Sequence, residues 1–339
     1  MNIRKEIEER EDEFLSPYAA RSTRSKGRKR PEKPDDFRTC YQLDRDRILH
    51  SKAFRRLKHK TQVFISPIED HFRTRLTHTL EISQIARTIA RALCLNEDLT
   101  EAIALGHDLG HTPFGHAGEY VLDGILKRID VAPSRHFLHN EQSIRVAEVL
   151  EKNGKGLNLS WEVLDGILHH PQKDRQLPAT LEGQVVRYSD HIAYIRHDIE
   201  DALLAKIIKL PDLPKKHTSV LGKNILDTII PNIIKCSKGK KKIMMDRKIR
   251  NAMNGLYDFL YKKVYTSPVA KGEETKIPHL LNQLFKYYHE NPEKIPGYRR
   301  GWNEVKIVQN IIDFIAGMTD RYATSKFIEI FVPNEWHIK

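Results

Sequence analysis

The segment LGHDLGHTPFGHAGE, residues 105–119, gathers side chains that bind metals and transfer protons. The residues of these types in it are His107, Asp108, His111, His116 and Glu119. Apolar residues at helical spacing precede it in EAIALG (101–106), and glycines and one proline punctuate the remainder. Glycine permits tight turns and close backbone contact, so the pattern predicts a helix that ends in a compact, reactive loop.

The rest of the chain predicts an all-α fold. Apolar residues recur at helical spacing at positions 82–93, 102–109, 144–149, 185–199 and 307–315. Alternation typical of strands is scarce, and its better candidates are VFISPI (63–68) and FIEIFVP (327–333). We therefore predict a helical core with a mostly helical C-terminal extension.

Composition restricts the class of protein. The chain has 339 residues, of which 40% are hydrophobic and 30% charged, as in ordinary globular proteins. The first residues, MNIRKEIEEREDEF, lack the apolar stretch of a signal peptide, and no run is long enough to span a bilayer. Three well-separated cysteines favour reduced thiols over disulfides or a cysteine-based zinc site. These features predict a cytoplasmic protein with no membrane association.

The formal charge of +12 and the pI near 9.4 favour polyanionic partners. Two basic runs stand out, ARSTRSKGRKRPEKPDD (20–36), which follows an expected N-terminal helix, and KCSKGKKKIMMDRKIR (235–250). We interpret the first as a loop or mobile arm, most simply a solvated linker, and the second as a solvated loop. Contact with phosphates is the alternative for both.

Residues on three helical segments form a candidate metal site. A divalent cation needs three or four ligands from different parts of the chain. Two antiparallel helices joined at LNEDLT (95–100) would bring His78 beside His107 and Asp108, and a later helix offers Asp190. Each residue alone is more typical of a structural role, a core histidine or a solvated helix face, and only their order along three helices favours a site. Imidazole and carboxylate together suit zinc, iron, manganese, cobalt or nickel.

At these residues the chain resembles the HD-domain phosphohydrolases, whose four metal ligands match His78, His107, Asp108 and Asp190. Within that superfamily it is similar to the dGTPase branch, the deoxynucleoside triphosphate triphosphohydrolases. The resemblance covers residues 36–202, with a weaker echo in DFIAGMTDRYA (313–323). Besides residues 105–119, the matching segments are FRRLKHKTQVF (54–64), RTRLTHTLE (73–81), HNEQS (139–143) and YSDHIAYIRHDIEDA (188–202).

The resemblance implies hydrolysis of a dNTP to a deoxynucleoside and inorganic tripolyphosphate, with one divalent metal per site (Mn, Mg, Fe, Co, Ni or Zn). It implies that His116 is the catalytic histidine, that Glu119 orients it, and that His111 contacts the phosphates or the metal-bound water. The substrate-binding positions are Gln62, Arg75, Tyr194 and Asp198, and a tyrosine packed over the sugar would disfavour a 2′-hydroxyl. A homo-oligomer is expected. A surface position is the alternative for Arg75.

Several further polar residues have two interpretations. His139, Asn140 and Glu141 would support the site or cap a helix. His169–His170, before Pro171, could reach the site, but we expect a loop. We divide the chain into an N-terminal helix and basic arm (1–40), an HD-domain catalytic core (41–205) and a C-terminal helical region that packs on it (206–339). The alternative functions are an HD nucleotidase or phosphodiesterase that acts on another nucleotide, and a basic protein that binds single-stranded nucleic acid around a structural HD site. Single-stranded DNA or a nucleotide is also a candidate effector.

Overall fold

The computed structural model describes residues 2–62, 73–132, 134–265 and 272–333, and it confirms the all-α prediction. Its only β-type pairings among these residues are isolated bridges, such as the one between Thr61 and Thr74. The helices are α1 (Ile3–Phe14), α2 (Cys40–Leu49), α3 (Lys52–Arg56), α4 (Arg75–Ala92), α5 (Glu97–Gly106), α6 (Gly115–Arg128), α7 (His139–Arg145), α8 (Glu151–Gly154), α9 (Trp161–Leu168), α10 (Leu181–Leu204), α11 (Lys215–Leu221), α12 (Ile225–Ser237), α13 (Arg247–Leu260), α15 (Ile277–Glu290), α16 (Glu304–Ala316) and α17 (Asp320–Phe331).

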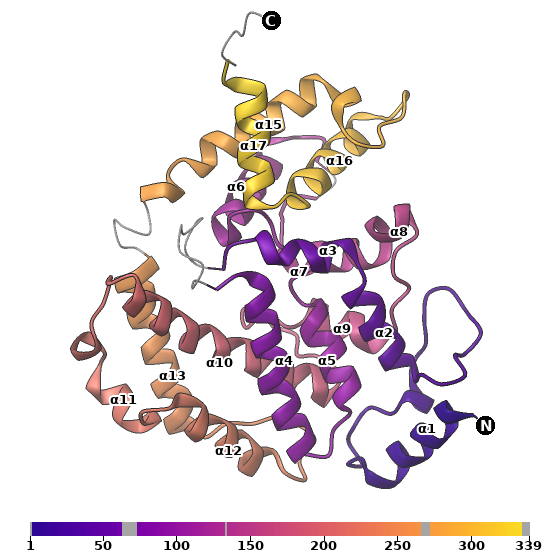
Figure 1. Ribbon diagram of the computed structural model, residues 1–339, viewed down its shortest axis with the longest axis vertical. Helices are drawn as coiled ribbons and strands as arrows, with labels where there is room; N and C mark the ends of the chain where they lie inside the picture. The colour runs from indigo at the N-terminus through magenta and orange to yellow at the C-terminus, as the bar shows by residue number, and fades with distance from the viewer. Residues whose placement is uncertain (1, 63–72, 133, 266–271, 334–339) are drawn as a thin grey trace, which may run out of the picture.

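Polar caps set the start of the three helices that carry the predicted metal ligands. Thr74 and Thr77 exchange side-chain and backbone hydrogen bonds at the start of α4. Asn96 caps α5 by accepting from the Leu99 amide, and Thr180 caps α10 by accepting from the Gly183 amide. With these starts fixed, α4 and α5 form the predicted hairpin, and α10 packs across both (Figure 1).

Two hydrophobic cores lie in different parts of the molecule. The larger unites α2–α5, α9, α10 and the α11–α13 segment. The smaller joins α6 to α15–α17, which lie together at one end of the molecule (Figure 1). Along the chain, residues from Phe114 to Phe137 belong to the smaller core, those from Val146 to Val264 to the larger one, and those from Ile277 onward to the smaller one again. The predicted domain boundaries after residues 40 and 205 remain predictions.

The first basic run, residues 20–36, is bound to the protein core. Its interpretation as a solvated linker or mobile arm is therefore wrong. The Arg28 guanidinium contacts the buried Asp44 carboxylate and donates to the Cys40 carbonyl at 2.9 Å. The Trp161 amide donates to the Gly27 carbonyl at 2.9 Å. A buried carboxylate and free carbonyls, which the local composition does not reveal, hold this segment on the core.

The other local predictions had mixed outcomes. The lysines of the second basic run, at 238 and 240–242, are exposed as expected. The strand prediction for residues 327–333 is wrong, because Phe327 and Ile330 lie on α17 and pack against the smaller core. A short apolar run fits either helix or strand, and here tertiary packing selects the helix. The other strand candidate, at 63–68, lies outside the described residues. No helix of the described ranges is long and apolar enough to cross a membrane.

Candidate metal centre and proton-transfer cluster

The structure brings the four predicted ligands to one place. His78 lies in the second turn of α4, His107 and Asp108 follow α5, and Asp190 lies within α10. Nε2 of His78 is 3.3 Å from Oδ1 of Asp190, and Nε2 of His107 is 3.5 Å from Oδ1 of Asp108. Ligand atoms of His78, His107 and Asp108 all lie within 4.8 Å of one another. Both histidines and Asp108 are buried.

The His107 ring presents a nitrogen lone pair to this space. Nδ1 of His107 lies 2.7 Å from the Ala104 carbonyl, which can only accept, so Nδ1 carries the hydrogen. Nε2 therefore has a lone pair, and it is buried with no hydrogen-bond partner. An orphaned buried nitrogen of this kind fits a cation.

Contacts through His197 indicate the same tautomer for His78, with the hydrogen on Nδ1 and the lone pair on Nε2. The Glu81 carboxylate contacts Nε2 of His197, and because a carboxylate can only accept, we infer that this nitrogen carries hydrogen. Nδ1 of His197, 3.2 Å from Nδ1 of His78, then accepts the His78 hydrogen. Nε2 of His78 is left with a lone pair toward the Asp190 carboxylate. Two electron-rich atoms at 3.3 Å repel unless a cation lies between them, so this pair also fits a bound metal.

The pKa values of both predicted acidic ligands are lowered, although Asp108 is buried and Asp190 half-buried. Burial opposes ionisation of Asp108, but the neighbouring histidines and the positive Arg75 guanidinium outweigh it and hold the pKa of Asp108 well below its usual range. Burial likewise opposes ionisation of Asp190, and the adjacent His78 and His107 rings lower its pKa. The Arg75 guanidinium donates to Oδ2 of Asp108, so this buried residue is not the surface arginine of the alternative interpretation.

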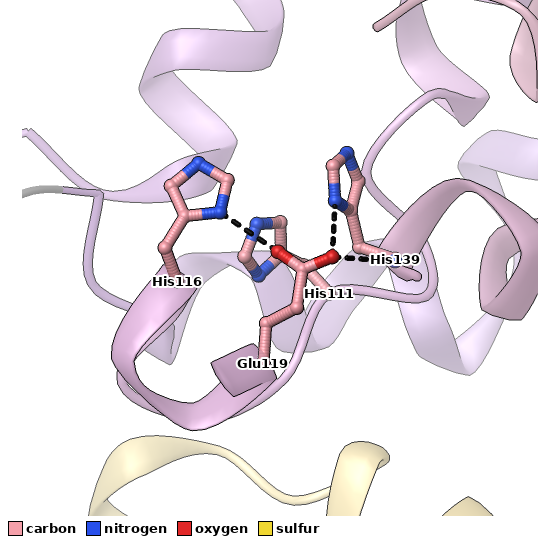
Figure 2. A group of neighbouring side chains, drawn as sticks. All are labelled: His111, His116, Glu119 and His139. Carbon is pink, nitrogen blue, oxygen red and sulfur yellow. Dashed lines mark hydrogen bonds and ion pairs between the residues drawn. The ribbon is translucent and has the colours of Figure 1, made fainter. Parts of the chain in front are cut away.

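A second cluster, of three histidines around Glu119, lies on the loop after α5 and on the starts of α6 and α7 (Figure 2). Nδ1 of His116 is 2.8 Å from Oε2 of Glu119, and Nδ1 of His139 is 2.9 Å from Oε1. Each carboxylate oxygen thus fixes a hydrogen on Nδ1 of one ring and leaves Nε2 to exchange a proton. The His116 side chain is 51% exposed, so its Nε2 is accessible to substrate or water.

Charge in this cluster is divided between Glu119 and His139. Burial disfavours the Glu119 carboxylate, but the His139 charge and the hydrogen bonds from both rings keep its pKa well below the usual range. Burial also disfavours a charged His139, and the Glu119 charge reverses that effect and raises the pKa of His139. His111 stacks on His139 with ring centroids 4.7 Å apart, and burial followed by the Arg75 charge lowers its pKa. Both ring nitrogens of His111 are buried without a partner, which leaves them available to a ligand.

The close backbone approach predicted from the glycines is confirmed at Gly110. A Cβ atom there would lie 2.1 Å from the backbone nitrogen of Ser143 in α7. The Gly110 amide donates to the Ser143 hydroxyl at 2.9 Å, and that hydroxyl also lies 2.9 Å from the carbonyls of His107 and His139. Ser143 therefore ties His107, a predicted metal ligand, to the cluster around Glu119.

The predicted substrate-binding residues line the same region. Oε1 of Gln62 is buried without a hydrogen-bond partner, and the Gln62 carbonyl lies near Gly115. Tyr194 and Asp198 follow Asp190 at four-residue spacing on α10, on the same face of the helix. Burial, and after it the charge of Asp201, raises the pKa of Asp198 well above its usual value, and both its carboxylate oxygens are buried without a partner.

Comparison with known proteins identifies the family. The HD domain model matches residues 75–195, and the phosphohydrolase-associated domain model matches residues 243–329. A deoxyguanosinetriphosphate triphosphohydrolase-like protein of Caldanaerobacter subterraneus subsp. tengcongensis is 55% identical over 99% of this chain and 98% of its own. Proteins with the same description from Desulfatibacillum aliphaticivorans and Clostridium perfringens are 46% and 47% identical, over 98% of this chain and 99% and 98% of theirs. The chain belongs to the deoxyguanosinetriphosphate triphosphohydrolase-like family. It is therefore an HD-family phosphohydrolase, and HD domains bind divalent metals.

One histidine of this HD-family phosphohydrolase lies closer to the site than we expected from the sequence. His170 is in a loop after α9, as predicted, but it also reaches the site, because it is buried with its ring 5.0 Å from that of His107 and its Nε2 3.3 Å from Nε2 of His139. His169 instead contacts Asp174 at 2.7 Å. The available signal was the position of His170 directly after the strongly apolar helix α9, since residues there tend to face the core.

In the HNEQS segment, residues 139–143, one of the three residues considered lies at the site and the other two do not. His139, the first residue of α7, reaches Glu119, so the helix-cap alternative is wrong for it. The Asn140 side chain donates to the Leu168 carbonyl at 2.7 Å, a structural contact, and Glu141 is exposed beside His136. Tyr257 of α13, which the sequence did not single out, has its ring 6.0 Å from that of Tyr194.

Proposed function

We propose that this chain is a metal-dependent dNTP triphosphohydrolase, which cleaves a dNTP into a deoxynucleoside and inorganic tripolyphosphate. The observation that carries the proposal is the pairing of a cation-ready ligand set with a carboxylate-oriented histidine, His116, joined through Asp108, Arg75 and Ser143. The relatives' name, deoxyguanosinetriphosphate triphosphohydrolase-like protein, supports the same substrate class.

We assign His78, His107, Asp108 and Asp190 as the residues that would hold one divalent ion. The native ion belongs to the group Mn, Mg, Fe, Co, Ni and Zn. When bound, it would polarise the α-phosphate and lower the pKa of a coordinated water. Arg75 contributes a fixed positive charge beside Asp108, which favours a triphosphate in this otherwise buried space.

In the proposed reaction, water attacks the α-phosphorus, the bond from phosphorus to the 5′-oxygen breaks, and the 5′-oxygen leaves with a proton. His116 holds or releases that proton at Nε2, because Glu119 occupies Nδ1. Glu119 keeps the ring oriented, as a carboxylate does for a catalytic imidazole. His111, neutral and with both ring nitrogens available, is suited to donate a hydrogen bond to a phosphate oxygen.

The deoxyribose is assigned to Gln62, Tyr194 and Asp198. The unpartnered oxygens of Gln62 and Asp198 suit the sugar oxygens and 3′-hydroxyl, because a buried polar atom without a partner is stabilised when a ligand supplies one. The Tyr194 ring, close to Tyr257, would pack over the sugar and disfavour a 2′-hydroxyl.

The proposal is tested by the products. Purified protein is incubated with each of the four dNTPs and with the matching NTPs, in Mn²⁺ or Mg²⁺, and the products are separated by ion-exchange chromatography. We expect deoxynucleoside and tripolyphosphate, with dNTPs preferred over NTPs. Release of monophosphate and pyrophosphate would contradict the proposed bond cleavage. Turnover of only monophosphates or cyclic nucleotides would move the protein to another HD activity.

A further inference from the structure

We propose that Asp320, the first residue of α17, is a positioning residue for the proton-transfer loop and thereby makes the C-terminal helices part of the active site. This inference rests on the proposed role of His116. It concerns the DRYA end of the segment 313–323, which the proposed chemistry does not otherwise use.

The Asp320 side chain is directed away from its own helix. Thr319 already caps α17 by accepting from the Tyr322 amide, so Asp320 is not needed as a cap. Instead, Oδ1 accepts from the Phe114 amide at 2.8 Å, and Oδ2 accepts from the Thr61 amide at 2.9 Å and contacts the Thr61 hydroxyl. Asp320 is 4% exposed, so these contacts are shielded from water.

The residue that Asp320 holds has an unusual backbone. Phe114 adopts the left-handed conformation, with φ of 61° and ψ of 25°, and directly precedes Gly115, the first residue of α6. Residues other than glycine rarely adopt this backbone conformation unless the surrounding structure imposes it. The Phe114 ring is buried in the smaller core with α15–α17, so its ring and its amide are both held from the C-terminal region. His116 follows two residues later.

The other end of the loop is held from the same side. The buried Lys60 ammonium donates to the Ala316 carbonyl at the end of α16, at 2.9 Å, and also contacts the His111 carbonyl. The Arg75 amide donates to the Lys60 carbonyl at 3.0 Å. The residues between His111 and His116 are thus clamped at both ends by contacts that reach α16 and α17. The start of α4, which carries Arg75, shares the clamp.

The chemistry of the contact makes Asp320→Asn an informative variant. A carboxylate has two accepting oxygens for the three donors here, whereas an amide keeps one oxygen and turns an NH₂ group toward a backbone N–H. Asp313→Asn is the matched control, because Asp313 of α16 also joins the C-terminal region to the core. It accepts from Arg145 and Gln142 of α7, and it does not contact the loop.

We expect Asp320→Asn to lower kcat for dNTP hydrolysis about 10-fold or more, with KM and metal content within about twofold of the wild type. Asp313→Asn should keep kcat within about threefold. The decisive measurement is kcat of the double variant Asp320→Asn/His116→Ala. This kcat should equal that of His116→Ala, because Asp320 acts by positioning His116 and has nothing to position once that histidine is removed. Losses that multiply, or equal losses in both aspartate variants, would overturn the proposal.

A second measurement needs no variant to fold. Hydrogen exchange of the wild-type chain should show the Phe114 amide protected, and a rapidly exchanging amide would refute the clamp. If the wild type hydrolyses no dNTP, the proposed function fails, whereas protection at Phe114 would still report the contact itself.

Discussion

The metal centre and the proton-transfer cluster use the same residue types and differ in what lies behind each imidazole. In the metal centre, Nδ1 of His107 donates to a carbonyl and Nδ1 of His78 to His197, so both Nε2 lone pairs face a space lined by carboxylates. In the proton-transfer cluster, a single carboxylate, Glu119, contacts Nδ1 of two rings and raises the pKa of one. The free nitrogens of the first region thus face carboxylates, which favours a cation between them, whereas the carboxylate of the second region stabilises a protonated ring.

The largest expected effect comes from removing Asp108, the proposed acidic ligand whose carboxylate also lies within 4.8 Å of a ring nitrogen of His139. Asp108→Ala should reduce bound metal to background and dNTP turnover by more than about 1,000-fold, because the ion loses a ligand and Arg75 loses its partner. Metal content by mass spectrometry and product release check this. Asp227→Ala, an exposed acid on α12, is the control. Full metal occupancy in Asp108→Ala would remove the distinction between the two regions.

The same assays should separate the regions when His116 is changed. His116→Ala is expected to keep its metal and lose about 100- to 10,000-fold in turnover, the range typical of a lost acid–base group. His136→Ala, which removes an exposed histidine beside Glu141, should leave both properties unchanged. A fully active His116→Ala would show that the proton is transferred elsewhere.

The residue behind His78 gives a smaller and more specific effect. His197→Phe should weaken metal affinity about 10- to 100-fold, since the His78 hydrogen loses its acceptor and the ring loses its preferred tautomer. Chelator competition measures this without any need for turnover. His197→Gln, which retains an acceptor and a donor, should restore most of the affinity.

Two glutamates, Glu81 and Glu200, provide a matched test of the contacts from Glu81 through His197 to His78. Glu81→Gln should weaken metal affinity, whereas Glu200→Gln should not. Both acids contact Arg73, but only Glu81 contacts His197. Equal affinities in the two variants would mean that the contact behind His78 is structural.

The smallest expected effect is a pH dependence confined to the proton-transfer cluster. Because Glu119 raises the pKa of His139 above its usual 6.5, protonated His139 stabilises the folded state below pH 6.5, and this stability is lost as the pH rises through the raised pKa. The free energy of unfolding of the metal-free protein should therefore fall above pH 6.5 by about 1.4 kcal/mol per unit of pKa elevation. Glu119→Gln should lack this fall in urea titrations at several pH values. A parallel decline in both proteins would assign it to another group.

Sequence reasoning succeeded where local pattern and chain order carry the information. The helical hairpin after Thr74 and the close approach at Gly110 follow from caps, apolar spacing and glycine, and the hairpin brings His78 to His107. It failed where a contact depends on how distant helices pack. His170 lies at the site because α9 packs against α5, and the basic segment around Arg28 is fixed by the buried Asp44.

The strand prediction at 327–333 failed for a related reason. FIEIF is a short apolar run interrupted only by Glu329, and Phe327 and Ile330 share one helical face. Only the presence of the smaller core selects the helix over a strand. The contact of Asp320 with Phe114 spans 206 positions, and no local pattern announces it.

The left-handed turn at Phe114 also affects the order in which the protein can be made. A ribosome synthesises all four proposed metal ligands long before it reaches Asp320, and the turn has no partner for its amide until α17 emerges. A nascent chain that has not yet exposed α17 would thus carry the proposed metal ligands before the proposed proton-transfer loop is held in place. Emergence of α17 would then be the step that fixes this loop.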